Sequence, residues 1–262
     1  MRKNKCFEEI VKSISGANVS ENAKHTCSNF TDSFNRFMVA EYETSNKHAT
    51  NKQYFEEAVK EYDKRIKNPS IFSNSGLHPN DQIRIYNSFQ KYNNQIVFDL
   101  GAGVVPDRTY NLLNDLGAKA YIGVEPFNYK EGKEALESSI DYFKKKYPLK
   151  KFIPYTFVES DINSILERVP DNSSSFIASG IDWCIINSNY FEECNSLIEK
   201  KLNPKGIFIS YASDFFSYRN QKLDNLDIWR PLGNSKLLIA EKRDNFGDSY
   251  SSNNRNKNSR EK

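Results

Sequence analysis

The chain has 262 residues, 38% of them hydrophobic, and a formal net charge of +3. This length suffices for one large domain or for a core domain with a smaller helical section. No stretch approaches the roughly 18 apolar residues of a membrane span, and the first residues lack the apolar run of a signal peptide. We therefore expect a cytoplasmic protein without a membrane partner. So small a net charge does not by itself indicate nucleic-acid binding.

The cysteines give no sign of a metal site or a disulfide framework. None of them has C-x-x-C spacing; they are Cys6, Cys27, Cys184 and Cys194. We expect reduced thiols and no bound metal.

Residues 1–94 are predicted to form a separate, mostly helical section. Apolar residues recur at helical spacing within residues 7–14, 30–38 and 55–66. Another helix is expected from about Gln82 to Tyr92, leading into the first strand. A family resemblance carried by later residues of the chain implies that this section is a cap or lid over a ligand; a helical layer that only completes the core is the open alternative.

A strand followed by a glycine loop comes next. Ile96–Leu100 is nearly continuously apolar and is followed by glycines, which predicts a buried parallel strand. Gly101 and Gly103 can adopt positive φ and let a ligand approach the backbone closely. Pro106 suits the first turn of a helix over about 107–116, whose free N–H groups favour a carboxylate or phosphate. This order of strand, loop and helix predicts a cofactor site.

The glycine spacing and the second strand narrow the kind of cofactor. The dinucleotide fingerprint G-x-G-x-x-G needs a third glycine where this chain has Pro106, which disfavours a pyrophosphate. The predicted second strand, Ala120–Val124, ends in Glu125 and Pro126. An acid at this point, about 20 residues after the glycines, can accept hydrogen bonds from both hydroxyls of a ribose.

A long helix is predicted from about Lys130 to Tyr147. Five lysines cluster at and beyond its C-terminal end, where the helix dipole favours cations; they are Lys144, Lys145, Lys146, Lys150 and Lys151. We interpret the cluster as solvated surface. A nucleic-acid backbone or an acidic partner is the less favoured alternative.

A third strand, Phe152–Val158, is predicted to lead to a second acid at the sheet edge. Asp161 follows it and precedes a helix over 162–169. Because open parallel sheets bind ligands at the carboxyl ends of their strands, Asp161 is expected to face the same crevice as Glu125. Taken alone, Asp161 indicates only a cap for the helix that follows it.

The fourth strand is predicted at Ile181–Ile186, after a polar loop over 170–175. It would deliver Asn187 and Tyr190 to the crevice, as candidates for orienting a substrate. Each also fits a structural role, as a turn residue and a packed ring. A helix over 191–202 follows.

The last predicted elements are a fifth strand over 207–211 and a terminal hairpin. Ile228–Ala240 reads as two strands joined by a turn at Leu232–Ser235. Such a hairpin at the end of a parallel sheet implies one antiparallel strand. Residues 243–262 have almost no apolar side chains and are predicted to be a disordered polar tail.

Two of these motifs carry a resemblance to a known family. Phe98-Asp-Leu-Gly-Ala-Gly103, followed by Gly123-Val-Glu-Pro126, resembles the first two motifs of the class I S-adenosylmethionine-dependent methyltransferases. The resemblance covers about residues 95–242. It implies a Rossmann-like α/β fold: a doubly wound, mostly parallel sheet of about seven strands, with one antiparallel strand from the C-terminal hairpin.

The resemblance also implies which residues hold the cofactor S-adenosylmethionine. Asp99 would anchor the loop and the amino group, the two glycines would accept the methionine portion, and Glu125 would hold the ribose. Asp161 would accept a hydrogen bond from the adenine amino group. The complete set of expected cofactor-binding residues is Asp99, Gly101, Gly103, Glu125, Pro126, Asp161, Ile162 and Asn187.

The expected activity is methyl transfer to a small-molecule or protein acceptor. A methyl transfer mainly requires that donor and nucleophile be held in line, with a base where the nucleophile carries a proton. No base is assigned; residues that could line the acceptor pocket are His78, Tyr86, Asn187, Tyr190, Tyr211 and Asp214. Two alternatives stay open, an NAD(P)-dependent oxidoreductase and a non-catalytic binding protein with this fold.

Overall fold

The computed structural model describes residues 5–21, 23, 79–178, 188–210, 225–230 and 237–243. Within these residues the strands are β1 (Ile96–Leu100), β2 (Ala120–Val124), β3 (Tyr155–Val158), β4 (Ser175–Ala178), β5 (Ile207–Ser210), β6 (Leu226–Trp229) and β7 (Leu238–Lys242). The helices are α1 (Lys5–Ile14), α5 (Pro79–Gln90), α6 (Asp107–Asp115), α7 (Tyr129–Lys146), α8 (Ile162–Arg168) and α9 (Ser188–Lys201). None of these helices is long and apolar enough to span a bilayer.

The described strands form one seven-stranded sheet in the order β3-β2-β1-β4-β5-β7-β6. Strands β1 to β5 pair in parallel, whereas β7 is antiparallel to both β5 and β6. The predicted fold class is therefore confirmed, including the antiparallel strand from the C-terminal hairpin. The turn predicted within this hairpin, and residues 244–262 of the predicted tail, lie outside the described residues.

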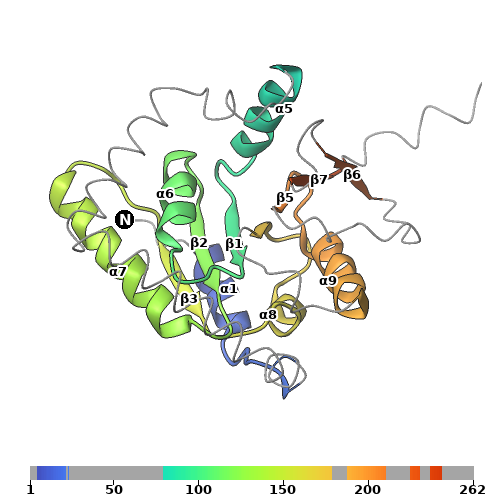
Figure 1. Cartoon of the computed structure of the whole chain (residues 1–262), viewed down its shortest axis with the longest axis horizontal. Helices are drawn as coiled ribbons and strands as arrows, with labels where there is room; N and C mark the ends of the chain where they lie inside the picture. The colour runs from blue at the N-terminus through green and yellow to red at the C-terminus, as the bar shows by residue number, and fades with distance from the viewer. Residues whose placement is uncertain are drawn as a thin grey trace, which may run out of the picture.

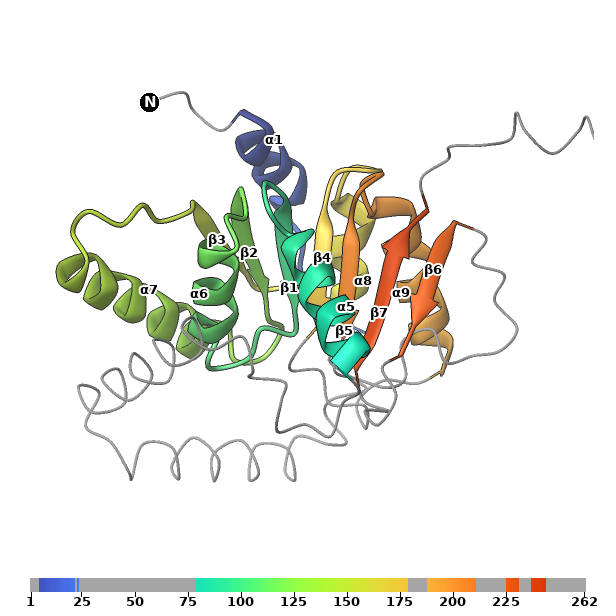
Figure 2. The ribbon, with the colours of Figure 1, turned by 90° about the horizontal axis from the view of Figure 1, so that it is seen from above.

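Helices cover both faces of the sheet, as Figures 1 and 2 show. Alternation along β1 explains the two layers, because Phe98 and Leu100 join one apolar cluster while Val97 joins the other. The first cluster also contains apolar side chains of α1, α8 and α9, and the second contains side chains of α5, α6 and α7.

Of the predicted N-terminal section, α1 and α5 are described. Ile10 and Ile14 of α1 are buried in the same cluster as Ile162 and Ile165 of α8. Thus α1 completes the core on one face of the sheet. The helices predicted within residues 30–38 and 55–66 lie outside the described residues, so the lid stays a prediction for them.

The position predicted for the fourth strand is wrong. Strand β4 is Ser175–Ala178, which pairs with β1 and β5, and it begins inside the stretch predicted to be a polar loop. The serines at the start of this strand made it look like a loop in the sequence, because a serine enters the core only when its hydroxyl has a hydrogen-bond partner. The Ser175 hydroxyl accepts a hydrogen bond from the backbone N–H of Ile207 at 3.2 Å, which lets this residue enter the sheet. Residues 181–186 lie outside the described residues.

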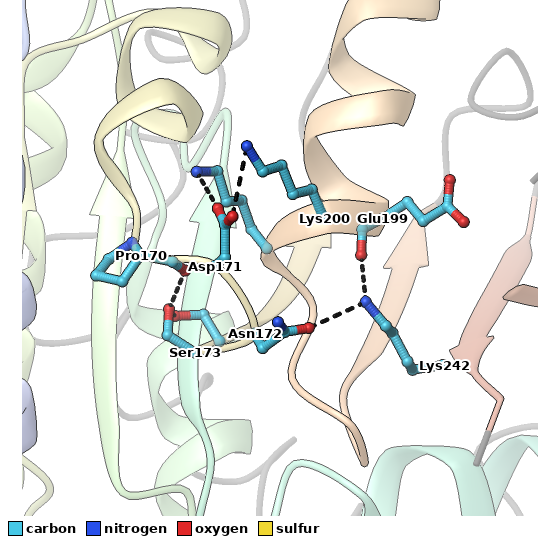
Figure 3. Close-up of polar contacts among 9 residues, drawn as sticks. Pro170, Asp171, Asn172, Ser173, Glu199, Lys200 and Lys242 are labelled. Atoms are coloured by element: carbon cyan, nitrogen blue, oxygen red, sulfur yellow. Dashed lines mark hydrogen bonds and ion pairs between the residues drawn. The ribbon is translucent and has the colours of Figure 1, made fainter. Parts of the chain in front are cut away.

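A lysine network ties together the amino end of β4, the C-terminus of α9 and the end of β7 (Figure 3). Lys201, which is 6% exposed, donates to Asp171 Oδ1 at 2.7 Å, and Lys200 lies 3.4 Å from the other oxygen of that carboxylate. These bonds hold the pKa of Asp171 below its usual value. Lys242 donates to the Glu199 carbonyl oxygen at 2.7 Å, near the end of α9, where carbonyl groups need donors. The network lies opposite the carboxyl ends of the strands, so it supports the fold and not the expected site.

Candidate functional site

Three buried acidic residues lie at or just after the carboxyl ends of adjacent parallel strands. Asp99 lies in β1, Glu125 directly after β2 and Asp161 shortly after β3, and their exposed fractions are 0%, 5% and 3%. Because β1 pairs with β2, and β2 with β3, the carboxyl ends of these strands lie side by side. The structure thus brings the predicted acids to one edge of the sheet.

The glycine loop turns its backbone amides toward β2. Gly101 and Gly103 have φ angles of 72° and 64°, which glycine adopts without a steric penalty. The N–H groups of Gly101 and Ala102 donate to the carbonyl oxygen of Val124 at 3.0 and 2.9 Å. The N–H of Gly103 donates to Glu125 Oε2 at 2.9 Å. Three consecutive amides of the loop are therefore bound to the end of β2.

Glu125 also holds the loop that follows β2. Its second carboxylate oxygen accepts hydrogen bonds from the N–H groups of Phe127 and Asn128, at 3.0 and 3.1 Å. The carboxylate accordingly accepts three backbone hydrogen bonds from two loops. Sequence reasoning placed Glu125 correctly at the tip of β2 but missed this structural role. Its role toward a ribose, and a ligand contact by the half-buried Pro126, stay predictions.

Asp99 is bound by a tyrosine that sequence reasoning did not identify. The Tyr121 hydroxyl donates to Asp99 Oδ2 at 2.9 Å, and both residues are fully buried. Burial raises the pKa of Tyr121 well above its usual value, and the Asp99 carboxylate raises it further. Tyr121 lies on β2 two positions before Gly123, the residue opposite Asp99. This same-face spacing is the signal that could have predicted the pair.

Asp107 is a further buried acid that sequence reasoning did not identify. It is the first residue of α6 and is 3% exposed, and its Oδ1 has no hydrogen-bond partner in the described part of the chain. Burial raises the pKa of Asp107, which the positive charge of Arg108 offsets only in part. An acid at a helix start usually indicates an exposed residue near the dipole, so its burial had no signal in the sequence.

Replacing Asp107 with asparagine is expected to stabilise the protein more at neutral than at acidic pH. The folded-state pKa of Asp107 is raised above 3.8, so the folded protein holds this proton more tightly than the unfolded chain. The contribution of Asp107 to stability is then largest below pH 3.8 and declines as the pH rises through the folded-state pKa. Urea unfolding at about five pH values between pH 4 and pH 8 measures the difference in the free energy of unfolding between the variant and the wild type. Asp141→Asn, at an exposed position on α7, is the control; a difference that does not grow with pH contradicts the prediction.

Asp161 caps α8 and binds the N-terminal segment. Oδ1 accepts from the N–H of Ser164 at 3.0 Å, and Oδ2 accepts from the Ser164 hydroxyl at 2.8 Å and the N–H of Ser20 at 2.7 Å. The cap predicted from the sequence is confirmed, while the contact with adenine stays a prediction. The neighbouring Ile162 is buried in the cluster that contains α1. No local signal predicts the Ser20 contact, because it joins residues 141 positions apart.

Most of the remaining predicted site residues lie outside the residues that the structure describes. Asn187, His78, Tyr211 and Asp214 lie outside the described residues, and the side chain of Tyr190 is not described. Tyr86 is described on α5 and is 50% exposed. The described part of β4 ends at Ala178, so the strand end predicted next to Asn187 lies outside the described residues.

Comparison with solved structures finds methyltransferases. The "putative methyltransferases" SMU.1697c from Streptococcus mutans, in complex with S-adenosylhomocysteine, and yhhF from Escherichia coli are 14% and 11% identical to this chain, with TM-scores of 0.42 and 0.41. Each match covers 62% of this chain, and 97% and 85% of the respective solved chains. A SAM-dependent methyltransferase from Archaeoglobus fulgidus is 19% identical over 49% of each chain, with a TM-score of 0.34. No protein-family model and no curated protein matches the sequence.

The fold assignment rests on the sheet itself. Five parallel strands are followed by a hairpin that inserts β7 antiparallel beside β5, and helices cover both faces. This is the arrangement that the sequence motifs imply, and the glycine loop and the acids occupy its carboxyl edge. The chain has the Rossmann-like α/β fold expected from the sequence, with one antiparallel strand, β7, between β5 and β6.

Proposed function

We propose that the chain is an S-adenosylmethionine-dependent methyltransferase acting on a small-molecule or protein acceptor. The observation that carries the proposal is the hydrogen bonding of the backbone amides in the glycine loop. The N–H groups of Gly101, Ala102 and Gly103 all bind the end of β2, and the acceptor for the last of them is the carboxylate of Glu125. The loop therefore presents an acid, and not a row of free amides, at the cofactor site.

This arrangement opposes phosphate binding at the loop. Loops that bind phosphate aim several free N–H groups at the anion, supported by the positive end of a helix. Here the amides of Gly101, Ala102 and Gly103 are occupied, and the carboxylate that holds the last of them would repel a phosphate. Pro106, at the N-cap of α6, occupies the place where the dinucleotide fingerprint needs its third glycine. These features disfavour a dinucleotide and suit a cofactor with a ribose, an amino group and a cationic sulfonium but no phosphate.

The residues of the site fit such a cofactor in defined roles. Gly101 and Gly103 leave the loop backbone open to close approach. In the proposed roles Glu125, which holds the loop, also accepts hydrogen bonds from ribose hydroxyls, and Asp161, which caps α8, accepts one from the adenine amino group. When bound, S-adenosylmethionine supplies an electrophilic methyl group, so the protein mainly has to orient the acceptor against it.

Calorimetric titration of the full chain tests the proposal. We expect a dissociation constant on the order of 1–100 μM for both S-adenosylmethionine and S-adenosylhomocysteine, and binding of NAD⁺ at least about tenfold weaker. Transfer of a labelled methyl group to a fraction of candidate acceptors would then identify the substrate class. Tighter binding of NAD⁺ than of S-adenosylmethionine would support the oxidoreductase alternative and overturn the proposal.

A further inference from the structure

The first turn of α7 packs directly against the glycine loop, and a glycine makes this possible. Gly132 is buried in that turn, and a Cβ atom built on it lies 2.4 Å from the carbonyl oxygen of Gly103 and 2.9 Å from Cζ of Phe157. Its N–H donates to Asn128 O at 2.9 Å, as in an ordinary helix. Gly132 does not have a positive φ. The position therefore requires glycine for space and not for backbone conformation.

Gly103 has the opposite requirement. Its φ is +64°, and a Cβ atom built on it meets nothing within 4 Å. Glycine is needed there for conformation, while the surrounding space is open. Its N–H is held by Glu125 and its carbonyl oxygen faces Gly132 of α7, so two different elements fix the same residue of the loop from its two sides.

Phe157 prevents α7 from simply moving away along the sheet. Its ring lies 2.9 Å from a Cβ atom built on Gly132 and 2.4 Å from one built on Gly123 of β2, and Phe157 is 7% exposed. The ring also packs against Tyr129 at the start of α7, with 5.8 Å between centroids. The first turn of α7 is thus confined between a core ring and the loop backbone, and close-packed interiors transmit such displacements.

We propose that Gly132 is a positioning residue of the cofactor site, which sets the place of the Gly103 peptide and thereby the shape of the loop that receives the cofactor. The inference rests on the proposed function. A methyl group at position 132 must displace either the loop carbonyl or α7, because the backbone oxygen cannot rotate away as a side-chain end could. A displaced Gly103 also strains its hydrogen bond to Glu125.

Three variants of the full chain separate the loop contact from the core contact. Gly132→Ala introduces both contacts, Phe157→Leu alone removes ring atoms from the core, and the double variant keeps the contact with Gly103 while removing the ring. The dissociation constant for S-adenosylmethionine is measured by calorimetry below the melting temperature of each. We expect this dissociation constant to increase at least about tenfold in Gly132→Ala and in the double variant. In Phe157→Leu it should change by less than about threefold.

A second measurement does not depend on the ligand. Hydrogen exchange of the Gly103 amide, which donates to Glu125, should be faster in Gly132→Ala than in the wild type. Recovery of wild-type affinity in the double variant would show that the alanine acts through Phe157 and would overturn the inference, as would unchanged affinity in Gly132→Ala. A wild-type chain that is folded but does not bind S-adenosylmethionine would instead overturn the proposed function itself.

Discussion

Replacing Glu125 with alanine is expected to raise the dissociation constant for S-adenosylmethionine by about 10- to 100-fold and to lower the free energy of unfolding by about 2–4 kcal/mol. The carboxylate accepts hydrogen bonds from the N–H groups of Gly103, Phe127 and Asn128. Its removal leaves three backbone donors without their charged acceptor and frees the two loops that they belong to. Calorimetry measures the affinity, and urea unfolding measures the stability.

Two further variants show whether both effects come from the carboxylate. Glu134→Ala removes an exposed glutamate from α7 and should change neither quantity by more than about 0.5 kcal/mol. Glu125→Gln keeps the shape and one acceptor oxygen, but its NH₂ group faces N–H donors, so it should fall between the wild type and the alanine variant. Unchanged affinity in Glu125→Ala would exclude Glu125 from the cofactor site and remove the main support of the proposed function.

Replacing Tyr121 with phenylalanine is expected to lower the free energy of unfolding by about 1.5–3 kcal/mol, the range for hydrogen bonds to charged groups. The lost hydroxyl donates to Asp99 Oδ2 at 2.9 Å, and both residues are fully buried. Water cannot readily replace a donor in such a place, so the carboxylate is less well stabilised. Chemical denaturation of the two proteins at pH 7 provides the comparison.

Tyr86→Phe is the matched control, because Tyr86 is 50% exposed on α5 and loses the same atom. Its unfolding free energy should stay within about 0.5 kcal/mol of the wild type. In a double-mutant cycle with Asp99→Ala, which leaves no acceptor for the Tyr121 hydroxyl, the two buried substitutions should be non-additive, since each removes the same bond. Additive effects, or a Tyr121→Phe variant as stable as the control, would show that the bond contributes nothing to stability.

Much of the fold could be predicted because its signals are local. The apolar runs of β1 and β2, the glycines after β1 and the proline before α6 each act within a few residues, and the observed elements agree with them. Gly117, directly after the C-cap residue Leu116 of α6, has a φ of 74°, the conformation in which glycine commonly ends a helix. The fourth strand could not be placed in this way, because Ser175 becomes a core residue only through its hydrogen bond with β5.

The amino-acid sequence by itself determined the order of strands and helices, the glycine loop, and the acids Glu125 and Asp161 near the tips of β2 and β3. Periodicity and turn chemistry are properties of neighbouring residues, so they can be read along the chain. Only the tertiary structure decided which groups these acids bind: Glu125 holds Gly103, and Asp161 binds Ser20. It also decided that Gly132 lies against the loop. Such contacts join residues far apart in the sequence, and they depend on how the layers pack, which no local pattern specifies.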